Sequence, residues 1–341
     1  MDDQKCNMWL LSTRRAELRF FPSPENVPDG YTILSHVWGS DETTFQEVQA
    51  LYDRCKKTGD SPRDFVQTKV RQACILAERH GFSWIWIDTC CIDKTSSAEL
   101  SEAINSMFRF YALSRLCYAF LEDVPFSSTL ADGTRSEFRK SRWYTRGWTL
   151  QELIAPKFVI FLSVDWRALG TKADLAELVE EITGVPGDVL RYQKNLADIS
   201  IARRMSWAAT RETTRIEDQA YSLMGIFGIN MPTLYGEGAQ AFYRLQEEIM
   251  KTSIDTSLFA WEIPDNMRSH TEEGQTYTAR RRVEAGTHDH FDPFSYLLAP
   301  SPGLFKGSRI DFDGEPAHPQ TVNLARLWLF CHQKLTSSSH C

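Results

Sequence analysis

Short apolar runs alternate with stretches of helical periodicity along the first half of the chain. The runs that predict buried strands are residues 31–37, 84–87, 117–121 and 158–162. The stretches that predict helices between them are residues 65–80, 96–113 and 146–153. Strands and helices that alternate at this spacing predict an α/β fold, with a parallel sheet and helices on both of its faces.

The chain after about residue 174 has a largely helical pattern. The clearest helices are predicted at residues 202–209, 214–227 and 240–251. Beyond Trp261 the chain becomes polar and loses this periodicity. The expected regions are an α/β core at 1–170 with its motifs from about 31 to 162, a helical extension packed on the core at 171–262, and an irregular, partly ordered C-terminal region at 263–341.

The segment RGWTLQEL, at residues 146–153, carries an aromatic ring and a carboxylate on one side of a predicted helix. Trp148 and Glu152 are four residues apart and share a face. Leu150 and Leu153 lie on the opposite face, where a core is expected. A tryptophan and a glutamate turned away from the core indicate a binding cleft or a partner surface. An ion pair between Glu152 and a nearby basic residue is the structural alternative.

Polar residues follow the first two predicted strands. Ser35, His36 and Trp38 close the first strand, and Asp88 closes the second. In open α/β sheets the ligand crevice lies outside the carboxyl ends of the strands. We therefore expect these side chains beside a crevice, with Glu152 on the helix that follows the third strand. A helix cap or a turn is an alternative explanation for the polar residues after the first strand.

Two adjacent cysteines, Cys90 and Cys91, come shortly after Asp88. They raise two reactive alternatives, a thiol catalyst that pairs Cys91 with His36 and a His/Cys metal cluster. Buried free cysteine is much commoner than reactive cysteine, and the ligand spacing typical of zinc is absent. We therefore predict no metal site and regard thiol catalysis as the weaker hypothesis.

Composition narrows the class of partner and the compartment. The 341 residues carry a formal net charge of −7, so the chain has no net positive charge that would attract nucleic acid. The N-terminus lacks a basic run followed by an apolar stretch, and no apolar run of about 18 residues occurs, so neither a signal peptide nor a membrane span is expected. The eight irregularly spaced cysteines suit free thiols in a reducing compartment. We expect a soluble cytoplasmic protein.

Three ordered motifs resemble the blocks of the fungal heterokaryon-incompatibility (HET) domain. They are LSHVWG at 34–39, WIDTCCID at 86–93 and RGWTLQEL at 146–153. The intervening segments ELSEAINSM at 99–107 and YAFLEDV at 118–124 fit the same family. RMSWA at 204–208, RIEDQAYSLMGIF at 215–227 and LYGEG at 234–238 resemble its usual helical continuation. The resemblance covers about residues 8–262.

This resemblance implies a role in fungal allorecognition and programmed cell death, triggered by a receptor or an incompatibility partner protein. The family is also remotely similar to Toll/interleukin-1 receptor (TIR) domains, which share a flavodoxin-like sheet. Some TIR domains hydrolyse NAD⁺ with a glutamate in a Trp-x-x-x-Glu-like segment. Trp148 and Glu152 match that segment here, so the resemblance gives Glu152 the role of key carboxylate.

Two functions follow as hypotheses. In the first, the protein is an NAD⁺ glycohydrolase without a resident cofactor, in which Glu152 stabilises the cationic ribose. Trp38 or Trp148 would then stack on a ring of NAD⁺, while Ser35, His36, Asp88 and Arg146 would bind the rest of the substrate. In the second, the protein is a non-enzymatic death module that self-associates, and Trp148 and Glu152 belong to its interface. The position of Glu152, in a pocket or on a flat exposed face, discriminates between them.

Overall fold

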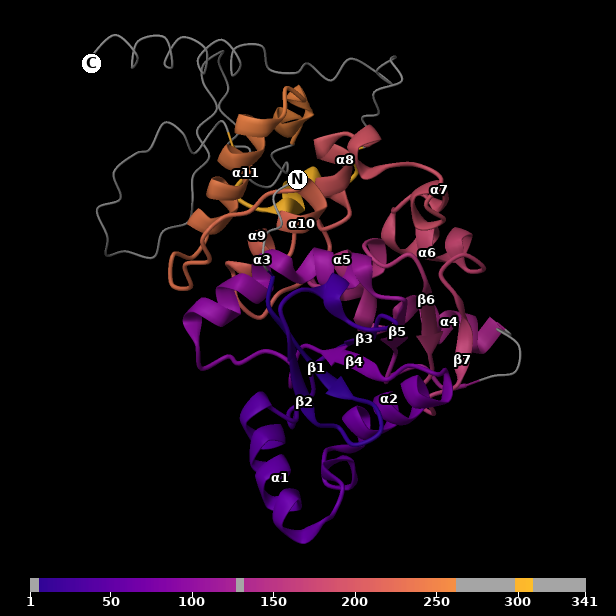
Figure 1. Cartoon of the computed structure of the whole chain (residues 1–341). Helices are drawn as coiled ribbons and strands as arrows, with labels where there is room; N and C mark the ends of the chain where they lie inside the picture. Colours follow the sequence, from indigo (N-terminus) through magenta and orange to yellow (C-terminus); the bar gives the residue numbers. More distant parts are fainter. Residues whose placement is uncertain (1–5, 127–131, 262–297, 309–341) are drawn as a thin grey trace, which may run out of the picture.

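A mixed seven-stranded sheet forms the centre of the computed structural model, which describes residues 6–126, 132–261 and 298–308 (Figure 1). The sheet has the order β2-β1-β4-β3-β5-β6-β7. Its strands are β1 (Met8–Ser12), β2 (Leu18–Phe21), β3 (Thr32–His36), β4 (Trp84–Ile87), β5 (Leu116–Phe120), β6 (Val159–Leu162) and β7 (Ala168–Thr171).

The four central strands, β4, β3, β5 and β6, are parallel to one another. Numbered along the chain, they lie in the order 2-1-3-4, which is the order of the first four strands of a flavodoxin-like sheet. These are the four predicted strands, so the α/β fold class is confirmed. The sequence did not predict the antiparallel strands that flank them, which are β1 and β2 at one edge and β7 at the other.

Helices cover both faces of the sheet (Figure 1). In the α/β part they are α1 (Phe45–Thr58), α2 (Thr68–Arg79), α3 (Ser97–Leu113), α4 (Asp132–Lys140) and α5 (Thr149–Ile154). Helix α2 packs on β4, whereas α3 and α5 lie together on the opposite face (Figure 1). The sequence did not predict α1, although Thr44 and Glu47 form a capping box at its start and Gly59 ends it in the left-handed conformation.

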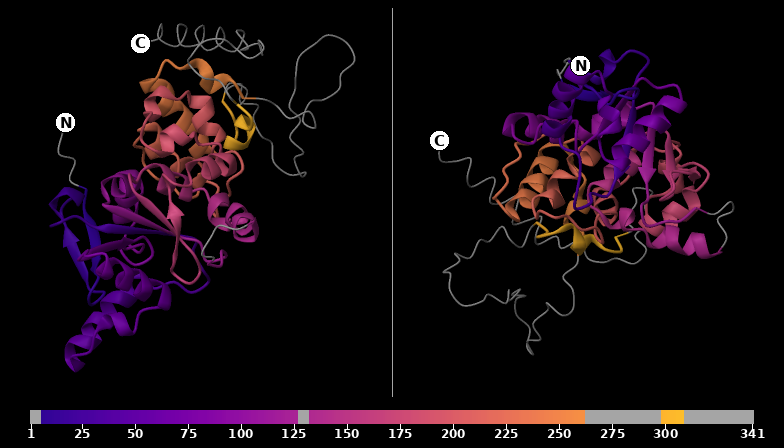
Figure 2. Two further views of the ribbon diagram at one scale, coloured as in Figure 1. Left: turned by 90° about the vertical axis from the view of Figure 1, so that its right-hand side faces the viewer. Right: turned by 90° about the horizontal axis from the view of Figure 1, so that it is seen from below.

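The rest of the described chain is a group of short helices that packs on the face carrying α3 and α5 (Figures 1 and 2). They are α6 (Ala176–Thr183), α7 (Gly187–Leu190), α8 (Ile201–Ser206), α9 (Asp218–Tyr221), α10 (Met224–Phe227) and α11 (Gln240–Thr252). The helix predicted at 214–227 is thus two short helices, α9 and α10. Helix α10 approaches α3 closely, because a Cβ atom on Gly225 would lie 2.1 Å from the Cβ of Phe108.

Single 3-10 turns connect several of these elements. They are η1 (Pro24–Asn26), η2 (Pro62–Asp64), η3 (Arg142–Thr145), η4 (Leu196–Asp198), η5 (Thr256–Phe259) and η8 (Pro302–Phe305). Residues 298–308, which contain η8, lie against the helical extension (Figure 2). They are fastened there by the buried Gln246, whose amide both donates to and accepts from the backbone of Ala299. We call residues 298–308 the strap.

The polar side of α5, for which the sequence indicated a binding cleft or a partner surface, is covered in the folded chain. All six residues of α5 are buried, because the sheet and α3 cover one side and the helical extension covers the other. Trp148 is the N-cap residue of α5 and is itself in the helical conformation. Throughout the described residues, no helix combines the length and the apolar character needed to cross a bilayer.

Candidate functional site

Glu152 points from α5 toward the carboxyl end of β3, with only 6% of its surface exposed. The Oγ of Ser35 donates a hydrogen bond to Glu152 Oε2. The indole Nε1 of Trp143 in turn donates to Ser35 Oγ at 2.8 Å. An indole N–H can only donate, so Ser35 accepts from Trp143 and uses its own proton to donate to Glu152.

The carboxyl group of Glu152 is held in its neutral form near pH 7. Burial raises its pKa most, and the negative charge of Asp88 adds to this effect. Hydrogen bonds to Ser35 and Tyr111 and the positive charge of Arg211 oppose the shift, so that the pKa of Glu152 lies at about 8. This site lies where the strand order reverses between β3 and β5, which is the position of the ligand crevice in open α/β sheets.

Asp88 connects Glu152 to the surface. Its Oδ2 accepts a hydrogen bond from Trp38 Nε1 at 2.7 Å, and its Oδ1 lies 3.9 Å from His36 Nδ1. Trp38 is 49% exposed, so its ring lies at the surface of this group, where the hydrogen bond to Asp88 holds it. The ammonium of Lys94 lies over this ring, 3.8 Å from its centroid. The structure therefore brings Ser35, His36, Trp38, Asp88 and Glu152 together.

A second carboxylate, which the sequence did not reveal, lies on the other side of His36. Glu42 Oε2 is 3.6 Å from His36 Nε2. Its Oε1 accepts from the amide of Gly39 at 2.7 Å and from Lys69 Nζ at 2.6 Å. Burial would raise the pKa of Glu42, but these partners together lower it to about 2, so the group stays ionised. His36 is thus enclosed between two carboxylates.

Arg146 and Trp148 lie on the side of α5 that faces the helical extension. The Arg146 guanidinium donates to Thr214 Oγ1 at 2.9 Å. The Trp148 side chain contacts Asp218 of α9 and lowers the pKa of its carboxyl group, which burial raises. The described interactions of these two side chains are therefore with the extension, whereas Glu152 interacts with β3 and α3.

Arg211 contributes a partly buried cation to this region, and no sequence motif marked it. Its guanidinium donates to the carbonyl oxygen of Arg146 at 2.8 Å and to Thr149 Oγ1 at 2.9 Å. Burial lowers the pKa of Arg211 to about 10, while the proximity of Tyr144 and Glu152 opposes the shift. A residue of the extension thus supplies positive charge near Glu152 and fastens the start of α5.

Lys172 fastens the other end of α5. Its ammonium donates to the carbonyl oxygens of Leu153 at 3.0 Å and Pro156 at 2.5 Å. Burial lowers the pKa of Lys172 to about 7. A cation at the C-terminal end of a helix also interacts favourably with the helix dipole.

The cysteines next to Asp88 have the environment of buried thiols. Cys90 and Cys91 are free and buried, and burial raises the pKa of Cys90 well above its ordinary value. The sulfur of Cys91 lies 3.4 Å from the backbone nitrogen of Ile87, which donates to it. In the described parts of the chain, no group of three or more His, Cys, Asp and Glu side chains is arranged to hold a metal ion.

The parallel core, with a polar group at its switch point, places the chain among flavodoxin-like α/β domains. Residues 31–132 match the family model described as heterokaryon incompatibility protein (HET), and residues 240–340 match a domain of unknown function, DUF8212. Residues 31–132 therefore form a heterokaryon-incompatibility (HET) domain.

One curated relative is the vegetative incompatibility protein HET-E-1 of Podospora anserina. It is 44% identical over 235 residues, which cover 67% of this chain and 17% of that protein. The chain thus spans about a sixth of the length of this relative. No solved structure matches the chain significantly. The remote similarity to TIR domains stays a prediction.

Proposed function

We propose that the protein acts in heterokaryon incompatibility and cell death, and that it does so by hydrolysing NAD⁺ with Glu152 as the key carboxylate. The family match and the relative named for vegetative incompatibility support the biological role. The observation that carries the enzymatic part is the buried position of Glu152 at the switch point, held by Ser35. A carboxylate on an exposed flat face would instead have favoured an assembly surface.

The reaction breaks the bond between C1′ of the ribose and the ring nitrogen of nicotinamide. The electron pair of this bond goes to the nitrogen, which loses its positive charge, so that nicotinamide leaves without a general acid. The ribose becomes an oxocarbenium ion, which a nearby carboxylate stabilises. Water then adds to C1′ and releases a proton, giving ADP-ribose, nicotinamide and H⁺.

The protonation state of Glu152 connects this chemistry to substrate binding. With a pKa of about 8, Glu152 is mostly neutral at pH 7 in the free protein. The cationic nicotinamide ring of NAD⁺ would favour the ionised form once it lies beside the carboxyl group. Substrate binding then releases the proton of Glu152, and the resulting carboxylate faces the ribose as positive charge develops.

The surrounding residues take separate roles in this proposal. The exposed ring of Trp38, held by Asp88, stacks on a planar ring of NAD⁺; Asp88 accepts from ribose hydroxyls and His36 donates to a hydroxyl or phosphate oxygen. Ser35 orients Glu152. Arg146 and Trp148, whose contacts lie on the extension side, support the N-terminal end of α5.

The test measures NAD⁺ loss and nicotinamide formation with the purified full chain. Glu152→Gln keeps the size and the hydrogen-bonding capacity of the side chain but cannot ionise, so we expect a loss of activity of at least about 100-fold. Glu247→Gln, on an exposed position of α11, is the matched control and should retain full activity. Unchanged cleavage by folded Glu152→Gln would refute the assignment of Glu152.

Cell death is tested separately by expression in a fungal host, where we propose a cytoplasmic site of action and activation by self-association or a receptor protein. We expect the wild-type chain to deplete NAD⁺ and to kill, and Glu152→Gln to do neither. Lethality that persists in Glu152→Gln without NAD⁺ loss would favour a non-enzymatic death module. Light scattering of the purified chain before and after activation measures self-association.

A further inference from the structure

Lys94 and Trp38 form a charged aromatic surface beside the Glu152 group. Lys94 lies in the segment between β4 and α3, at the same edge of the sheet as Trp38 and Asp88, which follow β3 and β4. Its ammonium is 3.8 Å from the centroid of the Trp38 ring. Asp88 accepts a hydrogen bond from the indole nitrogen of that ring at 2.7 Å. A half-exposed ring is thus held at its edge by a carboxylate and covered on one face by a cation.

The ammonium of Lys94 has neither a hydrogen bond nor an ion pair within the part of the chain that the structure describes. Partial burial lowers its pKa, whereas the negative charges of Asp88 and Glu42 raise it. An ammonium group has three N–H donors and no acceptor. A cation that has lost part of its hydration without gaining a hydrogen-bond partner interacts strongly with an anionic ligand. Lys94 is therefore a candidate anion-binding residue.

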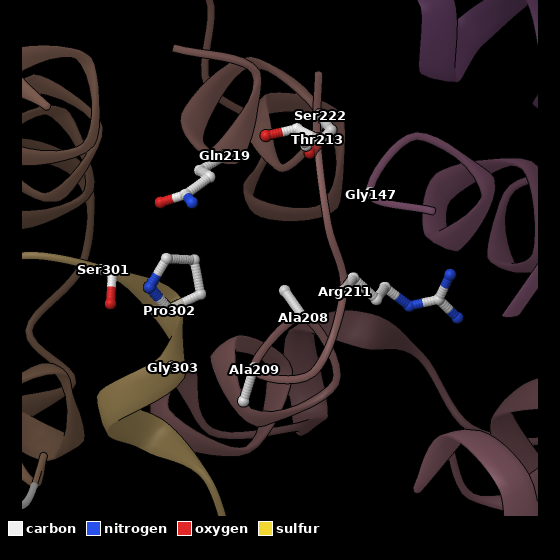
Figure 3. Close-up of a pocket in the computed structure, with 10 residues that line it drawn as sticks. All are labelled: Gly147, Ala208, Ala209, Arg211, Thr213, Gln219, Ser222, Ser301, Pro302 and Gly303. Atoms are coloured by element: carbon white, nitrogen blue, oxygen red, sulfur yellow. The ribbon is translucent and has the colours of Figure 1, made fainter. Parts of the chain in front are cut away.

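Two other cations near the site are already bound within the protein. Lys69 donates to Glu42 at 2.6 Å. Arg211 donates to the carbonyl oxygen of Arg146, and its guanidinium extends away from the small cavity beside the strap (Figure 3). The Nη2 of this guanidinium has no hydrogen-bond partner among the described residues, but it is buried. Lys94, in contrast, is an exposed residue, so an incoming ligand can reach it.

The charges along NAD⁺ indicate which part of this substrate Lys94 binds, and this step rests on the proposed hydrolysis. NAD⁺ has a cationic nicotinamide ring at one end, a neutral adenine ring at the other and a negatively charged diphosphate between them. The nicotinamide–ribose bond is broken beside Glu152, so the cationic ring lies there. A cation over the Trp38 ring repels a second cationic ring on the same indole but attracts the diphosphate.

We propose that Trp38 and Lys94 bind the adenosine diphosphate half of NAD⁺. The adenine ring stacks on the exposed part of the Trp38 ring, and the diphosphate accepts hydrogen bonds from the ammonium of Lys94. The two ends of the substrate are then separated by charge, with the cationic ring beside Glu152 and Asp88 and the anionic group beside Lys94. Lys94 thereby gives the site its affinity for a dinucleotide and takes no part in breaking the bond.

The experiment measures the binding of ADP-ribose, which contains this half of NAD⁺ but lacks nicotinamide, to the purified full chain by isothermal titration calorimetry. Lys94→Met keeps the apolar stem and removes the charge, so we expect binding to weaken at least about tenfold. Lys94→Arg keeps the charge and should bind nearly as the wild-type chain does. Trp38→Leu removes the ring and should weaken binding about tenfold. Lys56→Met is the matched control, because Lys56 also lies over an exposed ring, that of Tyr52 on α1, and it should leave binding unchanged.

Hydrolysis of NAD⁺ separates this inference from the proposed reaction. In a chain that hydrolyses NAD⁺, Lys94→Met should raise KM about tenfold and leave kcat unchanged. ADP-ribose binding that depends on Lys94 in a chain without hydrolysis would support this binding site and refute the proposed reaction. The inference is overturned if the wild-type chain does not bind ADP-ribose, or if Lys94→Met or Trp38→Leu, with an unchanged melting temperature, binds it equally well. Hydrolysis with an unchanged KM in Lys94→Met would likewise overturn it and leave the reaction in place.

Discussion

At the scale of single residues, the hydrogen bonds of Ser35 decide what Glu152 can do. Trp143 donates to Ser35 and Ser35 donates to Glu152 Oε2, an arrangement that the carboxyl group keeps when ionised and also when neutral with its proton on Oε1. Without Ser35, Glu152 Oε2 would lose this hydrogen-bond donor. A buried acceptor that is left unpaired lowers the free energy of unfolding by about 1–3 kcal/mol. Ser35, at the end of β3, is therefore a positioning residue, which orients Glu152 but does not contact a reacting atom.

The raised pKa of Glu152 predicts how stability depends on pH. The group is neutral in the folded chain up to about pH 8 but ionises near its ordinary pKa of 4.5 when unfolded. Its contribution is therefore fully present below pH 4.5 and is lost as the pH rises through 8. The free energy of unfolding of the wild-type chain should fall, relative to that of Glu152→Gln, between pH 5 and pH 8.5, by at most about 5 kcal/mol.

Urea unfolding of the two proteins at both pH values checks this prediction. The measured quantity is the difference in stability between the two proteins, because the titration of Lys172 changes stability in an overlapping pH range and in the opposite direction. Its lowered pKa of about 7 makes stability rise with pH between 7 and 10.5, equally in both proteins. A wild-type chain and a Glu152→Gln variant with parallel pH profiles would show that Glu152 is ionised in the folded state.

At the scale of elements, α5 is a short helix that depends on its neighbours. A helix of six residues is not stable by itself. Arg211 fastens its first turn and Lys172 its last carbonyl groups, while β3 and α3 cover one side. Glu152 therefore has a fixed position because other parts of the chain hold the helix that carries it.

The close approach of α10 to α3 gives a prediction at this scale. Gly225→Ala would place a Cβ 2.1 Å from the Cβ of Phe108, on the rigid part of that side chain. Separating the two helices should cost about 1–3 kcal/mol. Gly39→Ala, where the nearest atom lies 3.5 Å away, is the control and should change stability by less than about 0.5 kcal/mol. Chemical unfolding measures both, and equal values for the two variants would contradict close packing at Gly225.

The elements also show what the sequence could predict. The four parallel strands are buried on both faces and read as apolar runs. The strands β2 and β7 lie at the sheet edges with partly exposed residues, so no such run marks them. Helix α1 was not predicted because its mostly polar surface buries only Phe45, Val48 and Cys55.

The candidate site was predictable where it follows the strands. Ser35 and His36 end β3, while Trp38 and Asp88 follow the ends of β3 and β4, and parallel strands bring their carboxyl ends to one edge. Glu42 and Arg211 come from connecting segments, whose place depends on the packing of the whole chain. The sequence left open whether the polar side of α5 forms a cleft or a partner surface, because helical periodicity shows an apolar side but not what covers the polar one.

At the scale of the whole molecule, the α/β part and the helical extension share one buried core, which contains residues from Cys6 to Phe305. We predict that a chain ending at residue 170 does not unfold cooperatively, because it exposes the faces of α3 and α5 that the extension covers. A chain ending at residue 261 should keep a cooperative transition. Calorimetry of both chains measures this, and a sharp transition in the shorter one would contradict the prediction.

The position of Arg211 has a consequence for how such proteins diversify. Glu152 receives its local charge from Asp88 in the α/β part and from Arg211 in the extension, so neither part carries the complete electrostatic environment. Recombination that joined an α/β part to a foreign C-terminal module would separate the carboxyl group from its cation. The similarity to the incompatibility relative extends over 235 residues, well beyond the segment 31–132. We therefore expect the two parts to be inherited together, with exchange between genes occurring outside the pair.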